Sequence, residues 1–198
     1  MNHMKNSGRD KLWWFSGNGL RYAIAISTFC TLLLEKIMGD WLELGKKAPA
    51  FTLTADDGTK VRLADLKGSP LVLYFYPRDD TPGCTREACA FRDQKAALKK
   101  LGAQVFGISP DDVASHAKFR DKFKLNFLLL ADPGHKVSEK YGAWREKNMY
   151  GKKTMGIQRS TYLIDPSGKI AKVWKSVKVD GHDEKVLEAL REMATHEG

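Results

Sequence analysis

The stretch from Tyr74 to Cys89 constrains this chain most, because a strand, a turn and a helix start follow one another within it. The run from Pro70 to Tyr76 is apolar and aromatic, which is typical of a buried strand. Pro77 ends this strand because proline cannot donate to a ladder. The residues from Asp79 to Gly83 favour a turn and then the start of a helix. A cysteine therefore follows at the point where the helix begins.

Cys84 lies in the first turn of this expected helix, because Thr81 suits the N-cap and Pro82 suits the first helical position. The first turn offers unpaired N–H groups and the positive end of the helix dipole, and both favour a thiolate over a thiol. Thr81 also supplies a nearby hydroxyl. A small, buried structural cysteine is the alternative, but the helix-start placement and the presence of a second cysteine both favour a reactive thiol.

Cys89 follows Cys84 along a helical pattern that continues through Ala88, Phe91 and Leu98. On an intact helix this spacing places the two cysteine Cα atoms roughly 8–9 Å apart. A disulfide requires Cα atoms within about 7 Å, so a bond between these cysteines requires the first turns of the helix to unwind. The spacing also differs from the C-x-x-C of a dithiol exchanger and from the usual zinc spacings.

The pattern Pro77-x-x-x-Thr81-x-x-Cys84 resembles the active-site signature of the peroxiredoxins. The longer run TPGCTREAC resembles the peroxiredoxin Q or bacterioferritin comigratory protein subfamily, and the similarity covers about residues 39–196. It includes GISPDD at 107–112, LLADP at 129–133 and the stretch 141–170. The resemblance implies a thioredoxin-like α/β fold with a central mixed sheet flanked by helices and a peroxiredoxin N-terminal hairpin. The alternation of expected strands and helices independently indicates an α/β domain with a mixed sheet.

The resemblance implies a thiol peroxidase that reduces hydrogen peroxide and organic hydroperoxides to water and alcohols. Cys84 would form a sulfenic acid and Cys89 would be the resolving cysteine. The resulting Cys84–Cys89 disulfide would be reduced by thioredoxin or a similar dithiol. The resemblance implies no cofactor.

Further site residues also follow from the resemblance. Arg159 matches the family's arginine, whose fixed charge and several donors suit the stabilisation of a developing negative charge. Thr81 and the backbone N–H groups around Cys84 would hydrogen-bond the peroxide. Pro77 would shield the thiolate from water, although ending the strand is a sufficient role for it. Glu87 would orient the arginine, or it is a solvated helix charge.

The formal net charge of +9 allows contact with nucleic acid or membrane, but no compact basic run or aromatic-interleaved basic motif is present. We therefore expect a solvated surface, no nucleic-acid partner and a monomer. A basic binding protein with incidental cysteines and a thiol–disulfide oxidoreductase are the competing hypotheses. The three cysteines do not form a secreted disulfide scaffold, so a reducing, cytoplasmic location is expected. The histidines lack metal-ligand spacing and are expected at the surface: His3, His116, His135, His182 and His196.

Residues 1–37 differ from the rest, and we divide the chain into this N-terminal extension and a domain at 38–198. The apolar run from Tyr22 to Leu34 suits a signal-peptide core and is shorter than the ~20 residues of a spanning helix. An uncleaved membrane anchor, a targeting segment and an extension from an upstream start codon all remain open. We favour the last, because Met38 would open the family-like region naturally.

The other expected elements follow from apolar periodicity and turn residues. A hairpin turns at Asp57-Gly58, and Ser109 to Asp112 form a turn and helix cap. Trp144, Met149 and Tyr150 would line a pocket rim or serve in packing. Strands are expected at 103–108, 127–130, 160–164 and 169–174, and helical segments at 64–66, 113–123, 136–141 and 184–194.

Overall fold

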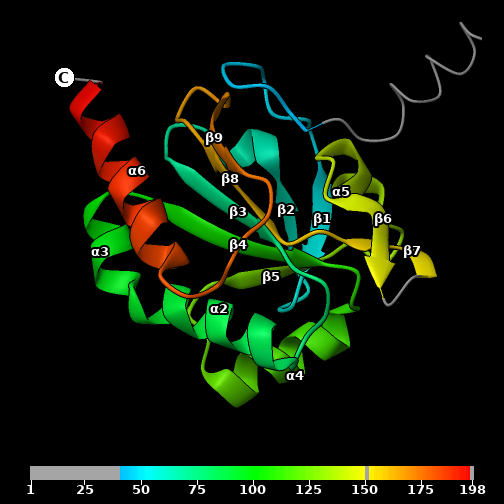
Figure 1. The fold of residues 1–198 in the computed structure, drawn as a ribbon. Helices are drawn as coiled ribbons and strands as arrows, with labels where there is room; N and C mark the ends of the chain where they lie inside the picture. The colour runs from blue at the N-terminus through cyan, green and yellow to red at the C-terminus, as the bar shows by residue number, and fades with distance from the viewer. Residues whose placement is uncertain (1–40, 150–151, 197–198) are drawn as a thin grey trace, which may run out of the picture. The chain divides into compact units, whose positions relative to one another are not determined.

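The computed structural model describes residues 41–149 and 152–196 (Figure 1). The extension at 1–37, with its apolar run and Cys30, lies outside the described residues, so its nature stays a prediction. Within the described residues, no helix has the length and hydropathy needed to cross a membrane.

Seven strands of the described chain form one sheet in the order β2-β1-β5-β4-β3-β8-β9 (Figure 1). The central strands β3, β4 and β5 are parallel, and the remaining pairs are antiparallel. The predicted mixed sheet is therefore confirmed, as is the N-terminal hairpin between β1 and β2. The strands are β1 (Thr52–Ala55), β2 (Lys60–Arg62), β3 (Leu71–Phe75), β4 (Gln104–Ser109), β5 (Leu128–Ala131), β8 (Ser160–Ile164) and β9 (Ile170–Trp174).

The helices connect these strands and differ from the expectation at one point. A single helix through Leu98 is wrong, because the chain breaks at Gln94, where ψ is 9°. The Gln94 side chain donates to Asp183 over 2.9 Å, which ties this break to the last helix. The helices are η1 (Leu63–Leu66), α2 (Pro82–Asp93), α3 (Lys95–Lys100), α4 (Val113–Phe123), α5 (Lys136–Lys140) and α6 (His182–His196).

Strand β3 forms the centre of the core because both of its faces are buried. Leu73 and Phe75 pack on the side of the sheet that holds Val137 of α5. Val72 and Tyr74 pack on the other side, against apolar residues of α2, α4 and α6 (Figure 1). A central parallel strand covered on both faces must be apolar throughout, which explains the uninterrupted run that the sequence shows.

A second, two-stranded sheet pairs β6 (Trp144–Met149) with β7 (Lys152–Ile157). This hairpin was not predicted from the sequence. It follows α5 and leads through Gln158 and Arg159 directly into β8. The hairpin is therefore attached to the segment that carries the predicted arginine.

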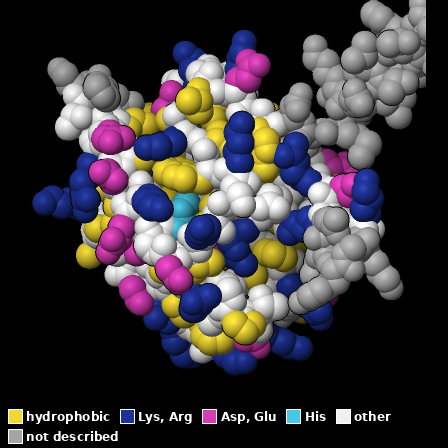
Figure 2. All heavy atoms as spheres, viewed as in Figure 1, with side chains coloured by type: hydrophobic (Ala, Val, Ile, Leu, Met, Phe, Trp, Pro, Cys, Tyr) yellow, Lys and Arg dark blue, Asp and Glu magenta, His cyan; other side chains and the backbone are white. Residues whose placement is uncertain are grey.

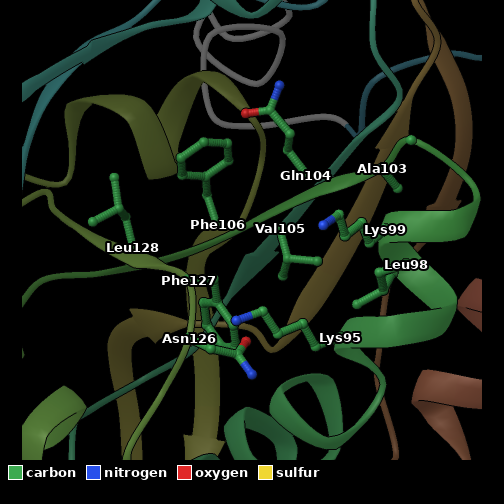
Figure 3. A pocket seen from close by; sticks show the side chains of 11 residues that line it. Lys95, Leu98, Lys99, Ala103, Gln104, Val105, Phe106, Asn126, Phe127 and Leu128 are labelled. Atoms are coloured by element: carbon green, nitrogen blue, oxygen red, sulfur yellow. The ribbon is translucent and has the colours of Figure 1, made fainter.

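Figure 3 shows a pocket of about 420 Å³ at the amino ends of β4 and β5. Lys95 and Lys99 of α3 line it together with apolar residues such as Leu98, Val105 and Phe127. Cys84 follows the carboxyl end of β3, which runs parallel to β4, so this pocket lies at the opposite end of the sheet from the cysteine.

Figure 2 shows Lys and Arg side chains spread over one face of the molecule, with Asp and Glu side chains among them. Several of these charges form ion pairs across exposed surface, such as Lys46 with Glu43 and Lys153 with Glu146. Exposed pairs of this kind contribute little to stability, typically about 0–1 kcal/mol. They fit the solvated surface that the composition predicts.

Candidate active site

Cys84 lies in the first turn of α2, as predicted, with Thr81 at the N-cap position and Pro82 at the first helical position. The loop between β3 and α2 carries it to the carboxyl edge of the parallel strands, where α/β sites form. Its side chain is 1% exposed and packs with Ala88 and the apolar residues beneath α2. A sulfur in this position is shielded from bulk water.

Arg159 reaches this sulfur because of the strand register. Strand β8 runs antiparallel to β3 with Ser160 opposite Phe75, so the residue before β8 lies at the carboxyl end of β3. Arg159 Nη2 donates to Cys84 Sγ over 3.1 Å. A hydrogen bond from a guanidinium favours the charged form of its acceptor, here the thiolate.

Glu87 lies on α2 one turn after Cys84 and is only 2% exposed. Arg159 Nη1 donates to its Oε2 atom. The geometry thus favours the role of an orienting carboxylate over that of a solvated helix charge. Burial raises the pKa of Glu87 to about 7, against the opposing effect of Arg159. Burial lowers the pKa of Arg159, but its contacts with Glu87 and Cys84 outweigh this effect and raise it.

Gly83 allows the guanidinium to lie close to the backbone before Cys84. A Cβ atom at this position would lie 3.3 Å from Arg159 Nη2, which is tighter than an ordinary contact. An alanine here would therefore require the guanidinium to shift by a few tenths of an ångström.

Thr81 and Pro77 lie in the loop that leads to Cys84. Thr81 is the N-cap residue, as predicted, and its hydroxyl donates to the Arg78 carbonyl over 3.2 Å, with no bond from its side chain to the N–H groups of α2. Pro77 lies two residues after the end of β3 and is exposed. Its position fits the end of the strand, and its shielding of the thiolate stays a prediction.

Cys89 is half-buried on α2, and both it and Cys84 carry free thiols. Helix α2 is intact from Pro82 to Asp93. The spacing of the two cysteines predicts that their sulfurs cannot bond while the helix is intact.

Asp79 anchors the loop before Cys84 through a buried network that the sequence analysis missed. Tyr76 Oη donates to its Oδ1 atom over 2.7 Å, and His116 Nδ1 lies 2.8 Å from its Oδ2 atom. Ser115 Oγ also donates to Oδ2 over 2.7 Å. Burial raises the pKa of Asp79, but these hydrogen bonds outweigh it and hold the pKa below its usual range. The prediction that His116 lies at the surface is wrong, because it is fully buried beside this carboxylate.

His182 is likewise buried, and its predicted surface position is wrong. Its Nε2 atom lies 2.8 Å from the Thr161 hydroxyl, and its ring packs edge-on against Phe91 and Trp174. Burial lowers the pKa of His182 to about 4. No local sequence pattern distinguishes such a histidine from an exposed one, because its partners lie in other elements.

The described residues contain no group of three or more His, Cys, Asp or Glu side chains arranged to hold a metal ion. Trp144 stacks on His135 with ring centroids 3.7 Å apart, which is a packing role. The side chains of Met149 and Tyr150 lie outside the described residues, so the predicted pocket rim stays a prediction.

The sequence profile of the AhpC/TSA family matches residues 44–173. This chain belongs to the AhpC/TSA family. Among peroxiredoxins of the Bcp type, it is 53% identical to a protein of Coxiella burnetii over 74% of this chain and 97% of the relative. It is 48% identical to peroxiredoxin Bcp of Bacillus subtilis over 77% of this chain and 98% of the relative.

Solved structures of peroxiredoxins also match. Peroxiredoxin Q of Xanthomonas campestris is 41% identical, with a TM-score of 0.70, over 72% of this chain and 90% of that one. The bacterioferritin comigratory protein of the same organism, solved to examine its alkyl peroxide reduction activity, is 38% identical. It gives a TM-score of 0.73 over 77% of this chain and 99% of that one. The thioredoxin-like fold and the peroxiredoxin Q/Bcp resemblance are confirmed, and the chain is a peroxidase of the oxidoreductase class.

Proposed function

We propose that this peroxiredoxin reduces hydrogen peroxide and organic hydroperoxides with Cys84 as the attacking thiol and Cys89 as the resolving thiol. The observation that carries the proposal is the contact of Arg159 with the buried Cys84 sulfur at the start of α2. A cation and a helix start together favour the thiolate, which is the nucleophilic form of cysteine.

In the first step the Cys84 thiolate attacks one peroxide oxygen, so that a sulfur–oxygen bond forms and the oxygen–oxygen bond breaks. The sulfur is oxidised to a sulfenic acid, and the leaving oxygen takes a proton and departs as water or an alcohol. Arg159 is the proposed stabiliser of the charge that develops on the departing oxygen, which its contact with the Cys84 sulfur supports. Thr81 and the N–H groups at the helix start are the proposed donors to the peroxide, and Pro77 is proposed to limit water access.

In the second step the Cys89 thiol condenses with the sulfenic acid, which releases water and forms the Cys84–Cys89 disulfide. The first turns of α2 must unwind for this step. A thioredoxin-like dithiol then reduces the disulfide by thiol–disulfide exchange and is itself oxidised. A reducing compartment such as the cytoplasm supplies such a dithiol, and we propose it as the site of action.

The test is hydrogen peroxide consumption coupled to a thioredoxin-type dithiol in the full chain. Cys84→Ser is expected to abolish consumption. Cys89→Ser is expected to react once, to stop, and then to accumulate sulfinic acid at Cys84, because the sulfenic acid persists. Full activity of Cys84→Ser would refute the role of Cys84, and normal dithiol-coupled turnover of Cys89→Ser would show that Cys89 is not the resolving thiol.

A further inference from the structure

Lys147 lies on β6 and directs its ammonium group toward the segment that carries Arg159. Its Nζ atom donates to the carbonyl of Ile157, the last residue of β7. The aliphatic part of the side chain passes Gly156 on the way, and the residue is half-buried. Ile157 is two residues before Arg159, so the hairpin brings a second basic side chain to the edge of the sheet where Cys84 lies.

The charges around Cys84 leave a place for a second cation when Glu87 is ionised. Arg159 contacts both the Glu87 carboxyl group and the Cys84 sulfur. When Glu87 is ionised, its charge offsets that of the single guanidinium. A thiolate at Cys84 then leaves these three groups, of which Cys84 and Glu87 are buried, with one net negative charge, which is costly without a further cation.

We propose that Lys147 is a second cation of the peroxide site, one that stabilises the Cys84 thiolate and the negative charge of the departing oxygen. This inference rests on the proposed function and adds a residue to it. With Lys147 and an ionised Glu87, the reduced site holds two cations and two anions and is neutral overall.

The electrostatics of Lys147 support this placement. Burial lowers its pKa, the Arg159 charge lowers it further, and Cys84 opposes both effects. The ammonium group therefore lies within electrostatic range of both the arginine and the cysteine. A lysine that served only to cap the Ile157 carbonyl would give the hairpin stability but would have no effect on the thiol.

The experiment separates charge from structure with a set of variants. Lys147→Gln and Lys147→Met remove the charge, and Lys147→Arg keeps it. Lys153→Met is the matched control, because Lys153 lies exposed on the same hairpin and pairs with Glu146. The first readout is the rate constant for reaction of the reduced full chain with hydrogen peroxide, measured from about pH 5 to about pH 8. The second is the alkylation rate of Cys84 by iodoacetamide over the same range, which does not require peroxidase activity.

We expect the neutral variants to react about tenfold more slowly with both reagents at neutral pH, and to reach their full rate at higher pH. Lys147→Arg and Lys153→Met are expected to remain within about twofold of the wild type on the same scale. Wild-type rates and pH profiles in both neutral variants would overturn the inference. Equal losses in Lys147→Arg and the neutral variants, with unshifted pH profiles, would also overturn it, because they would show a structural role. If the wild type alkylates readily at Cys84 but ignores peroxide, the proposed function fails while the effect of Lys147 on the thiol remains measurable.

Discussion

Arg159 links the Glu87 carboxyl group to the Cys84 sulfur. The carboxyl group and the sulfur accept from different nitrogens of one guanidinium. When Glu87 is neutral, the positive charge of Arg159 stabilises the thiolate more strongly. When Glu87 is ionised, it holds the guanidinium in a fixed orientation. We therefore expect the protonation of Glu87 to affect both the stability of the fold and the reactivity of the Cys84 thiol.

Glu87→Gln tests the buried state of this carboxyl group. Its pKa is raised from 4.5 in an ordinary setting to about 7 in the folded protein, so the folded state binds more protons than the unfolded chain between these values. The contribution of Glu87 to stability is therefore present at low pH and is lost as the pH rises. We expect the free energy of unfolding of the wild type, relative to the variant, to fall by about 1–3 kcal/mol across this window. Denaturant titrations at several pH values measure it.

Glu188→Gln is the matched control, because Glu188 is an exposed carboxylate on α6. It should keep the wild-type pH dependence. The same slope in Glu87→Gln as in the wild type would contradict the burial argument.

At the scale of elements, α2 is held unequally at its two ends. Near its end, Gln94 bonds Asp183 over 2.9 Å, and Phe91 packs against His182 of α6. Near its start, the link to the segment before α6 is the exposed pair of Arg86 and Asp180 at 3.2 Å. Exposed pairs are cheap to break. The contacts of Arg159 with Cys84 and Glu87 also hold the first turns, so unwinding for disulfide formation must break these contacts as well, while the end of α2 stays docked.

His182→Gln tests the docking of α6. We expect its effect on the pH dependence of stability to be opposite in sign to that of Glu87→Gln. Burial lowers the pKa of His182 from 6.5 to about 4, so the unfolded chain binds more protons than the folded state between these values. Its contribution to stability is lost as the pH falls through this window. We expect the free energy of unfolding of the wild type, relative to the variant, to rise with pH here. A falling or flat difference would show that the ring is not buried as a neutral group.

Gly107→Ala tests the packing of β4 against β3 and β5. A Cβ atom at Gly107 would lie 2.6 Å from Tyr74 Oη and 2.8 Å from Leu129 Cδ2, both in the core. Overpacking of this kind costs about 1–3 kcal/mol of stability. Gly134→Ala is the control, because the nearest atom to its Cβ would be 3.9 Å away. Equal free energies of unfolding for the two alanine variants would contradict the packing account.

The elements with strong local signals could be predicted from the sequence. Strand β8 was expected with its observed bounds, because Ser160–Ile164 is β-forming and Asp165-Pro166 ends it. The hairpin of β6 and β7 was missed, since its strands carry many charged residues in place of a regular apolar alternation. Arg159 was named as a site residue from the family resemblance alone, and its contact with Cys84 was found in the structure. The buried Asp79–His116 pair could not be found, because it joins residues far apart in the sequence.

At the scale of the whole molecule, the family profile matches residues 44–173, all of which lie after the N-terminal extension. The Bacillus subtilis relative is covered over 98% of its length by 77% of this chain. We expect a chain that starts at Met38 to fold and to keep full peroxidase activity. Unfolding titrations and peroxide consumption, compared with those of the full chain, measure this. Loss of folding in the shortened chain would show that residues 1–37 belong to the domain.

The central claim is that the Cys84 sulfur, held by the start of α2 beside Arg159, is the atom that peroxide oxidises. The most direct measurement mixes the reduced full chain with one equivalent of hydrogen peroxide, traps the remaining thiols with an alkylating reagent at successive times, and maps each cysteine by mass spectrometry. The account predicts that Cys84 is lost first and that a Cys84–Cys89 disulfide then accumulates. Consumption of peroxide while Cys84 remains fully alkylatable would contradict it.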